Sequence, residues 1–410
     1  MARESIIIVG GGQAAGCAAS ELRQVGFDGR ITIIGEEAAA PYERPPLSKE
    51  YLAGGFDLER AAVNPPNFYT DNSIDLLLNE RVTQINPQER KVETAQGKSL
   101  PFDKLLIATG CRARRLNSLA PSRGAVVCLR TAEDAGQIAR RLHPGKRLLL
   151  IGGGFIGLEV AGAARAKGCD VTVLEAAGAL LSRVMPAPAA AFVEALHRAQ
   201  GVIIETSVLV EGLEDLGDRA IVQVIDGRRF EADLVVIGIG AVPNQSLAVE
   251  AGGACQDGII VDMGGRTSIP GVFAAGDVTR RHSSFYNQAI RLETWDNARR
   301  QAQVTARNMI GQEALYDEVP WMWTDHYGRN IQMLGLPALA DEVVTRGDPE
   351  SGPFIVISRR NGQIVAATFV DQGRERRPLT RLMRDRTIVP VEVLRDSSVP
   401  LKTLAEKFCA

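Results

Sequence analysis

Two glycine-rich turns, each followed by a carboxylate, are the residues whose types and spacing are best suited to chemistry. In the second turn, Gly152, Gly154 and Gly157 have the spacing Gly-x-Gly-x-x-Gly, and Glu175 follows further along the chain. In such a pattern the first glycine makes a tight turn, the second lets a pyrophosphate approach the backbone, and the third lets a helix pack closely on a strand. A carboxylate at the end of the next strand can accept hydrogen bonds from a ribose. These residues predict a site for a dinucleotide.

The first turn lies close to the start of the chain and has the same elements. Gly10 and Gly12 are followed by Ala15 at the third glycine position, which the Gly/Ala form of the motif allows, and Glu36 ends the next apolar run. Two such units in one chain predict two bound dinucleotides. The alternative, in which one of them is an ordinary glycine-rich turn, is disfavoured because both have the strand, the helix and the carboxylate.

Strands and helices must position these turns. Apolar runs at residues 6–9 and 148–151 predict buried strands that lead directly into the glycines. Alanine-rich stretches reaching about residue 26 and covering residues 160–167 predict the helices that follow, and residues 31–34 and 171–174 predict the next strands. The free N–H groups and the positive end of each helix dipole would then face the phosphates.

Length and composition limit the class of protein. The chain has 410 residues, enough for two or three domains, and a formal net charge of −2, so no global signal for nucleic acid is present. Its longest apolar runs are short and contain glycine, which argues against a membrane span. We expect a cytoplasmic protein.

The cysteines and histidines favour neither a metal site nor a redox dithiol. The six cysteines are scattered without a C-x-x-C or C-x4-C pair, and none of the four histidines has a partner at i+3 or i+4. We therefore expect no zinc or iron–sulfur site in this chain and no disulfide beside a cofactor.

Three further segments could contribute to function. Residues 41–49 form a proline-rich polar loop, in which Ser48 is predicted to cap a helix. Residues 267–278 predict a strand that ends at Asp277, a second carboxylate at a strand end. Near the C-terminus, residues 354–357 and 364–370 predict a hairpin through Asn361 and Gly362, and an arginine-rich segment, residues 374–386, follows it.

The order of these motifs resembles one family over essentially the whole chain. The chain resembles the FAD-dependent ferredoxin–NAD reductases in the order of its motifs. That order is the first glycine-rich turn, PYERPPLSK, LLIATG, the second glycine-rich turn, GIG-x-x-PN, TS-x-P-x-VFAAGD and PWMWTD. These reductases serve bacterial Rieske aromatic-ring dioxygenases and cytochromes P450, and include the biphenyl and phenylpropionate dioxygenase reductases and putidaredoxin reductase. The resemblance implies an α/β fold with two Rossmann-like nucleotide-binding domains, one inserted in the other as in glutathione reductase, and a C-terminal α+β domain. The expected boundaries are 1–110 with 240–316 for FAD, 111–239 for NADH, and 317–410 for the C-terminal domain.

The resemblance also implies roles for individual residues, matched position by position. Those for FAD are Gly10, Gly12, Ala14 and Ala15 at the pyrophosphate, Glu36 at the adenosine ribose, Lys49 near the flavin ring, Val82 near the adenine, Arg130 by the phosphates, Asp277 at the ribityl chain and Trp295 against the isoalloxazine. Those for NADH are Gly152, Gly154, Ile156 and Gly157 at the pyrophosphate, Glu175 at the ribose and Glu159 on the nicotinamide side. Lys49, Glu159 and Trp323 would take part in catalysis, with Trp321 as a neighbour of Trp323.

Each assignment has a structural alternative. Lys49 and Arg130 could be solvated surface charges, Glu159 a helix-surface carboxylate, and the tryptophans core or interface aromatics. The arginine-rich segment could be a solvated helix face, or a basic surface that attracts an acidic ferredoxin. Glu175 would repel the phosphate of NADP, so we expect a preference for NADH.

The resemblance implies electron transfer from NADH through FAD to a small [2Fe–2S] ferredoxin of Rieske type, and indirectly to a terminal aromatic-ring oxygenase. The alternatives are a reductase for a cytochrome P450 ferredoxin or a rubredoxin, an NADH oxidase or disulfide reductase on the same fold, and a binding protein without catalysis. A disulfide reductase needs a cysteine beside the flavin, and PYERPPLSK has none. The sequence leaves open the oxygenase, its substrate, the ferredoxin and the oligomeric state.

Overall fold

A computed structural model describes residues 4–116, 123–350 and 352–409, which divide into two compact units. The first unit contains the chain up to Pro46, Phe56–Arg112 and Ala241–Glu318. The second unit contains Leu47–Gly55, Ala113–Gly240 and the chain from Val319 onward. Each unit is built around its own sheet of parallel strands.

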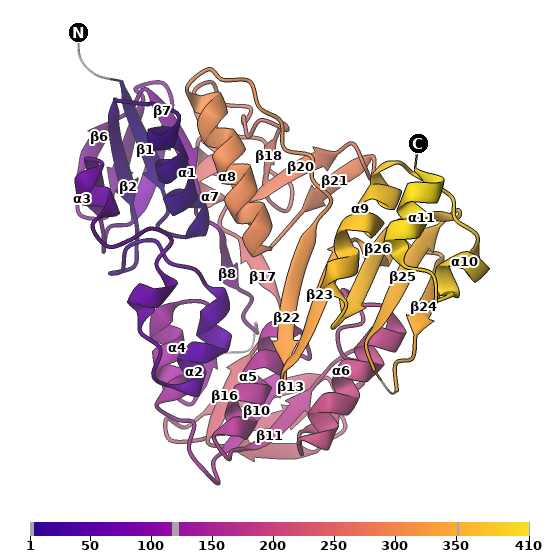
Figure 1. Ribbon diagram of the computed structural model, residues 1–410. Helices are drawn as coiled ribbons and strands as arrows, with labels where there is room; N and C mark the ends of the chain where they lie inside the picture. Colours follow the sequence, from indigo (N-terminus) through magenta and orange to yellow (C-terminus); the bar gives the residue numbers. More distant parts are fainter. Residues whose placement is uncertain (1–3, 117–122, 351, 410) are drawn as a thin grey trace. The chain divides into compact units, whose positions relative to one another are not determined.

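The first unit has a central parallel sheet whose strand order is β19 (Val272–Ala274), β7 (Lys104–Ile107), β1 (Ser5–Val9), β2 (Arg30–Ile34) and β3 (Ile74–Leu77). The helices α1 (Gln13–Gln24) and α8 (Trp295–Met309) lie side by side against it (Figure 1). Ile6 and Ile8 pack toward these helices, whereas Ile7 and Val9 pack into a second core on the other face. Because both faces are covered, the strand reads as an unbroken apolar run.

The remaining elements of this unit cover the sheet and its edges. They are η2 (Leu58–Ala61), α3 (Phe68–Asp71), the antiparallel β4 (Val82–Asn86), β5 (Lys91–Thr94) and β6 (Ser99–Pro101), the pair β8 (Cys111–Ala113) and β17 (Ala241–Pro243), α7 (Ser246–Glu250), and the small sheet of β18 (Ile259–Val261), β20 (Thr279–Ser283) and β21 (Gln288–Arg291).

The second unit contains the second parallel sheet, in the order β12 (Ile203–Glu205), β11 (Asp170–Leu174), β10 (Arg147–Ile151), β16 (Leu234–Ile237) and β9 (Val126–Cys128). Its helices are α2 (Glu50–Ala53), which follows the turn η1 (Pro45–Ser48), α4 (Ala132–Ala139), α5 (Phe155–Ala166) and α6 (Ala187–Ala199). The antiparallel strands β13 (Val210–Asp215), β14 (Ala220–Val224) and β15 (Arg229–Ala232) cover one face. These three strands are preceded by β12, which joins the parallel sheet.

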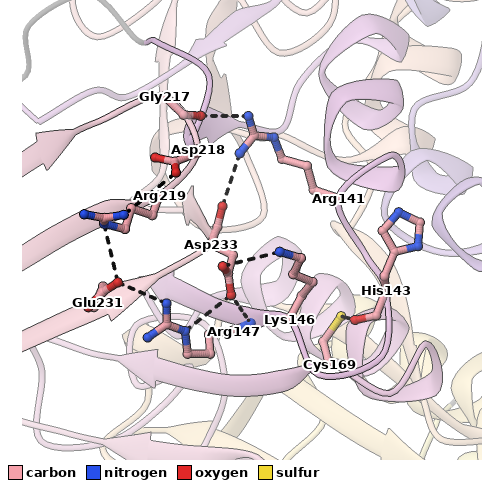
Figure 2. A network of polar contacts seen from close by, with 10 residues as sticks. All are labelled: Arg141, His143, Lys146, Arg147, Cys169, Gly217, Asp218, Arg219, Glu231 and Asp233. Carbon is pink, nitrogen blue, oxygen red and sulfur yellow. Dashed lines mark hydrogen bonds and ion pairs between the residues drawn. The ribbon is translucent and has the colours of Figure 1, made fainter.

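A polar network holds the start of β10 against the turn between β15 and β16 (Figure 2). One carboxylate oxygen of Asp233 accepts hydrogen bonds from the backbone N–H of Arg147, at 2.9 Å, and from its guanidinium, at 3.3 Å. Lys146 lies 3.5 Å from the other oxygen, and Arg141 donates to the Asp233 carbonyl at 3.2 Å. These contacts fix the register at the amino ends of the strands, opposite the edge that carries the glycine turn.

The C-terminal part of this unit is a five-stranded antiparallel sheet in the order β22 (Trp321–His326), β23 (Arg329–Gly335), β26 (Gln363–Val370), β25 (Phe354–Arg360) and β24 (Glu342–Gly347). Its helices are η3 (Pro337–Leu339), η4 (Gly373–Glu375), α9 (Arg376–Arg384), α10 (Val391–Arg395) and α11 (Leu401–Phe408), with α9 packed on β26 and on α11 (Figure 1). The predicted hairpin is confirmed: Asn361 and Gly362 both have positive φ, 51° and 80°, as a two-residue turn between twisted strands requires. None of the helices in the described residues has the length and apolar content needed to cross a membrane.

Candidate active site

The first glycine turn lies between β1 and α1. Gly10 has a φ of 119°, and a Cβ there would lie 2.3 Å from the carbonyl oxygen of Ala108, so only glycine fits. At Gly12, apart from chain neighbours, the nearest atom to a Cβ would be Nη2 of Arg44 at 4.0 Å, and no side chain caps α1. Ala15 is fully buried, which explains why a small residue suffices at the third position. The turn therefore combines a fixed backbone with open space above the helix N-terminus.

Two carboxylates lie at the same edge of the first sheet as this turn. The strands β1, β2 and β19 run parallel, so their carboxyl ends meet there, and Glu36 and Asp277 follow β2 and β19. A Cβ on Gly276 would lie 3.1 Å from that of Ala14, which places the Gly-Asp segment against the first turn of α1. Val82 is buried in β4, where it pairs with Thr94 of β5. The sheet edge thus brings together the glycine turn predicted to bind the phosphates and the carboxylates predicted to accept hydrogen bonds from the hydroxyls of one nucleotide.

The polar residues around this edge offer a dinucleotide both a hydrogen-bond acceptor for a hydroxyl and a cation for a phosphate. Oε1 of Gln13 is buried without a hydrogen-bond partner among the described residues, at the first position of α1. Arg44 forms an ion pair with Glu37 at 2.9 Å, and its guanidinium faces Gly12. Arg44 lies in the proline-rich loop of residues 41–49 and has no predicted role, because its closeness to Gly12 is visible only in the fold. Trp295 opens α8, with the guanidinium of Arg299 5.2 Å from its ring centroid.

The second glycine turn lies between β10 and α5 and has the same geometry. Gly152 has a φ of 105°, and its Cβ would lie 2.5 Å from the carbonyl oxygen of Gly238. A Cβ on Gly157 would lie 2.5 Å from the Gly152 oxygen, whereas one on Gly154 would meet nothing closer than 3.9 Å. Ile156 is 44% exposed, unusual for a large apolar side chain at a helix start. The geometry matches the three glycine roles that the sequence predicts.

The contrast between two of these glycines leads to a prediction. Gly154→Ala adds its methyl group to open space at an ordinary φ of −86°, so the variant should fold normally but raise the KM for the dinucleotide roughly tenfold, or about 1.4 kcal/mol of binding free energy. Gly157→Ala forces a contact with backbone and should lower the free energy of unfolding by about 1–3 kcal/mol. Thermal melts and steady-state kinetics on both variants test this. A Gly154→Ala variant with unchanged KM would contradict the assigned role.

Glu175 follows β11 and holds the second turn in shape. Its carboxylate accepts hydrogen bonds from the backbone N–H groups of Gly153, at 2.6 Å, and Ala177, at 2.7 Å. Arg130 follows β9 at the same edge of the sheet, and its backbone N–H donates to Asp134 at 2.9 Å. Glu175 therefore lies at the end of β11, where the sequence placed it.

Lys49 and Glu159 meet in the second unit, where a buried polar centre forms around the Glu159 carboxylate. Nζ of Lys49 lies 3.4 Å from Oε1 of Glu159 and 3.1 Å from Asp325, and the Glu159 side chain is only 9% exposed. The hydroxyls of Ser48 and Thr324 donate to the two oxygens of Glu159 at 2.5 and 2.6 Å. Burial raises the pKa of Glu159, opposed by Lys49 and the two hydroxyls. The alternatives of a surface lysine and a surface glutamate do not hold for this structure.

One local prediction was wrong. Ser48 does not cap α2: the helix starts after Lys49, without a side-chain capping bond. The Ser48 hydroxyl instead donates to the buried Glu159 carboxylate, because a charged acceptor forms the stronger hydrogen bond.

The tryptophans of β22 lie beside Lys49. The rings of Trp321 and Trp323 stack with centroids 5.3 Å apart, and Lys49 Nζ is 5.7 Å from the Trp323 centroid. The indole of Trp321 donates to Gln332 at 3.1 Å, and the Arg376 guanidinium lies 4.2 Å from its ring centroid. A flat aromatic surface therefore adjoins the Lys49–Glu159 pair.

Within the described residues no cysteine forms a disulfide, and burial raises the pKa of several of the thiols. That of Cys17 rises to about 11, so the residue is a thiol rather than a thiolate near neutral pH. Among the described residues, no group of three or more histidine, cysteine or acidic side chains is placed to hold a metal ion.

Two glycine turns with the geometry of dinucleotide-binding motifs and a buried lysine–glutamate pair are typical of an oxidoreductase that uses two dinucleotides. Residues 4–302 match the pyridine nucleotide-disulphide oxidoreductase family, and residues 321–405 match the reductase C-terminal family. The chain belongs to the pyridine nucleotide-disulphide oxidoreductases.

Relatives of known function narrow the class. The chain is 38% identical, over 98% of its length and all of the relative, to the ferredoxin–NAD(+) reductase component of the anthranilate 1,2-dioxygenase system of Burkholderia cepacia. It is 37% identical to putidaredoxin reductase of Pseudomonas putida, over 98% of this chain and 97% of that one. A solved covalent complex of putidaredoxin reductase with putidaredoxin matches with a TM-score of 0.95 at 36% identity, covering 99% of both chains. The predicted fold class and resemblance are confirmed, and the chain is an FAD-dependent oxidoreductase of the ferredoxin reductase type.

Proposed function

We propose that this chain passes electrons from NADH, through FAD, to a small [2Fe–2S] ferredoxin of Rieske type, which supplies an aromatic-ring-hydroxylating dioxygenase. The observation that carries the proposal is the pair of glycine turns with open space at the second glycine, in a chain without a C-x-x-C or C-x4-C pair. Bound FAD can accept a hydride from NADH and release the two electrons singly. Without a dithiol to receive them, the electrons go to an external acceptor. We place the protein in the cytoplasm, where NADH is supplied.

The proposed domains follow the two turns. Residues 1–110 and 240–316 bind FAD, residues 111–239 bind NADH, and residues 317–410 contribute to the flavin environment and to ferredoxin docking. The residues that hold FAD are Gly10, Gly12, Ala14 and Ala15 at the pyrophosphate, Glu36 at the ribose, Val82 at the adenine, Arg130 at the phosphates, Asp277 at the ribityl chain, and Trp295 and Lys49 at the ring. The residues that hold NADH are Gly152, Gly154, Ile156 and Gly157 at the pyrophosphate, Glu175 at the ribose and Glu159 at the nicotinamide.

The catalytic residues act by charge and by position. Lys49 supplies a positive charge that stabilises an anionic reduced ring. Glu159, held by Ser48 and Thr324, orients Lys49 and can hold a proton on its carboxylate. Trp323, stacked on Trp321, offers a flat apolar surface that excludes water.

The test is reduction of cytochrome c by NADH with and without added ferredoxins. We expect the purified protein to be yellow, its colour to bleach rapidly with NADH, and cytochrome c reduction to depend on a ferredoxin. A colourless protein that cannot be reconstituted with FAD would refute the proposal. Bleaching with oxygen as the only effective acceptor would favour an NADH oxidase instead.

A cytochrome P450 system is the second candidate for the oxygenase that the reductase serves. Putidaredoxin reductase is about as similar to this chain as the dioxygenase reductases are, so a ferredoxin or rubredoxin of a cytochrome P450 system is an alternative acceptor. An oxidase has weaker support, because the solved water-forming NADPH oxidase is 19% identical and shares the fold alone. Competition between ferredoxins of both kinds in the cytochrome c assay distinguishes the acceptors.

The arginine-rich segment gives a prediction about docking. Arg377 and Arg384 are exposed on α9. Positive charges there would speed the association with an acidic ferredoxin. Arg377→Glu with Arg384→Glu should lower kcat/KM for ferredoxin roughly tenfold at low salt and much less at high salt. Arg395→Glu, an exposed change on α10, serves as the control. Unchanged salt dependence in the double variant would leave the segment as a solvated helix face.

A further inference from the structure

Within the second unit, a linear chain of hydrogen bonds connects Glu159 to Tyr327, which is partly exposed. The Thr324 hydroxyl donates to Glu159 at 2.6 Å, and Nε2 of His326 lies 3.0 Å from the same hydroxyl oxygen. Nδ1 of His326 lies 3.2 Å from Nε2 of His197, and Nδ1 of His197 lies 3.0 Å from the hydroxyl of Tyr327. Residues more than a hundred positions apart thus form one continuous path.

Donor and acceptor counting gives this path one direction. A threonine hydroxyl has a single proton, which goes to Glu159, so His326 must donate to Thr324 through Nε2. A neutral imidazole has one N–H, so Nδ1 of His326 accepts from Nε2 of His197, and Nδ1 of His197 accepts from Tyr327. Every donor along the path points toward the carboxylate.

The burial of the path keeps it neutral. Thr324 and His197 are fully buried, and His326 is 3% exposed. Burial lowers the pKa of His326 to about 3 and that of His197 to about 4, with His197 and Lys49 further lowering that of His326 and Asp325 opposing them. Tyr327 is partly exposed in the turn between β22 and β23, with its ring 3.8 Å from where a Cβ on Gly162 of α5 would lie. Both imidazoles of the path are therefore uncharged near neutral pH.

We propose that Glu159 exchanges a proton with solvent along Thr324, His326, His197 and Tyr327. In one shift, Tyr327 takes a proton from water and gives its own to Nδ1 of His197, whose Nε2 proton passes to Nδ1 of His326. The Nε2 proton of His326 then passes to Thr324, and the Thr324 proton passes to Glu159. Each O–H or N–H bond broken is matched by one formed: the Glu159 carboxylate becomes neutral, and the water that gives the proton becomes hydroxide, or a hydronium ion becomes water. The reverse shift returns the proton to water.

Under the proposed function, the relay would release to water the proton that NADH oxidation produces. Oxidation of NADH by two oxidised ferredoxins gives NAD⁺, two reduced ferredoxins and one proton, because the ferredoxins take electrons only. The proton is freed when the reduced flavin gives up its electrons, and if the buried Glu159 carboxylate takes it up, Glu159 needs a route by which the proton leaves. The relay deepens the proposed function and rests on it for this role, whereas the hydrogen-bond path itself can be tested without it.

The first test uses the resting protein labelled with ¹⁵N-histidine, which gives signals from four residues only. We expect His197 and His326 to carry their proton on Nε2 at neutral pH and to remain neutral at about pH 5.5, where ordinary histidines are charged. Tyr327→Phe removes one oxygen and keeps the ring, so exchange of the two Nε2 protons with water should slow by about tenfold or more. His143→Gln, at an exposed histidine of the same unit, should leave that exchange unchanged. Protons on Nδ1, or unchanged exchange in Tyr327→Phe, would overturn the relay.

The second test follows proton release with a pH indicator during a single turnover with ferredoxin. In the unsubstituted protein, proton release should keep pace with ferredoxin reduction, and in Tyr327→Phe it should lag behind by about tenfold. Release that keeps pace in both proteins would overturn the relay but leave the proposed function intact. Absence of ferredoxin reduction in the unsubstituted protein would instead refute the proposed function, while the imidazole measurements would still decide whether the path exists.

Discussion

Glu175→Gln is expected to raise kcat/KM for NADPH relative to NADH by more than about tenfold. The unsubstituted protein should prefer NADH, because the phosphate of NADPH would lie against the Glu175 carboxylate. A pair of unit charges at 4 Å repels by about 4 kcal/mol at an effective dielectric near 20, and a heavily screened fraction of that still exceeds tenfold. No arginine follows among Ala176, Ala177 and Gly178 to offset it.

The ratio of the two cofactors is the quantity to measure. Glu175 also accepts hydrogen bonds from Gly153 and Ala177, and glutamine keeps only one oxygen for them, so activity with both cofactors should fall by a similar factor. Glu194→Gln, on α6 and paired with Arg198, removes a charge elsewhere in the same unit and should leave the ratio unchanged. Comparable kcat/KM values for NADH and NADPH in the unsubstituted protein would contradict the prediction.

Lys49→Met is expected to lower NADH-dependent turnover about a hundredfold and to make the flavin midpoint potential more negative. The variant removes the only lysine near the buried Glu159 carboxylate in the described contacts, at 3.4 Å, and the positive charge proposed to stabilise the reduced ring. Stopped-flow reduction and a potentiometric titration measure the two effects. Lys402→Met, at an exposed lysine of α11, is the control. A potential equal to that of the unsubstituted protein would place Lys49 away from the flavin.

The free energy of unfolding of Lys49→Met should also depend on pH differently from that of the unsubstituted protein. Burial raises the pKa of Glu159, and Lys49 opposes that rise. The pKa of Glu159 in Lys49→Met should therefore be higher still. A raised pKa means that the folded state binds the proton more tightly than the unfolded state, so its stabilising contribution is complete at acid pH and is lost as the pH rises through the folded-state pKa. Lys49→Met should therefore lose stability relative to the unsubstituted protein as the pH rises from the ordinary range of a glutamate carboxyl through the raised folded-state pKa. Adding Glu159→Gln should abolish this dependence in urea unfolding, and its persistence would assign it to another group.

The sequence by itself determined the two nucleotide-binding units. An apolar run, glycines at fixed spacing, an alanine-rich helix and a terminal carboxylate are all local, and each has one mechanical role, so Gly152, Gly154 and Gly157 could be assigned before any fold was known. The Asn361–Gly362 hairpin was predictable for the same reason, because few other residues adopt two successive positive φ angles.

Only the tertiary structure decided what surrounds Glu159. Ser48, Thr324 and His326 come from segments far apart in the chain, and no spacing in the sequence indicates that their side chains converge on one carboxylate. Local preference even gave the wrong role for Ser48, since its position before a helix suggests a cap. A buried charge must be satisfied by whichever donors the fold brings to it, and that choice depends on packing between remote segments rather than on neighbours in sequence.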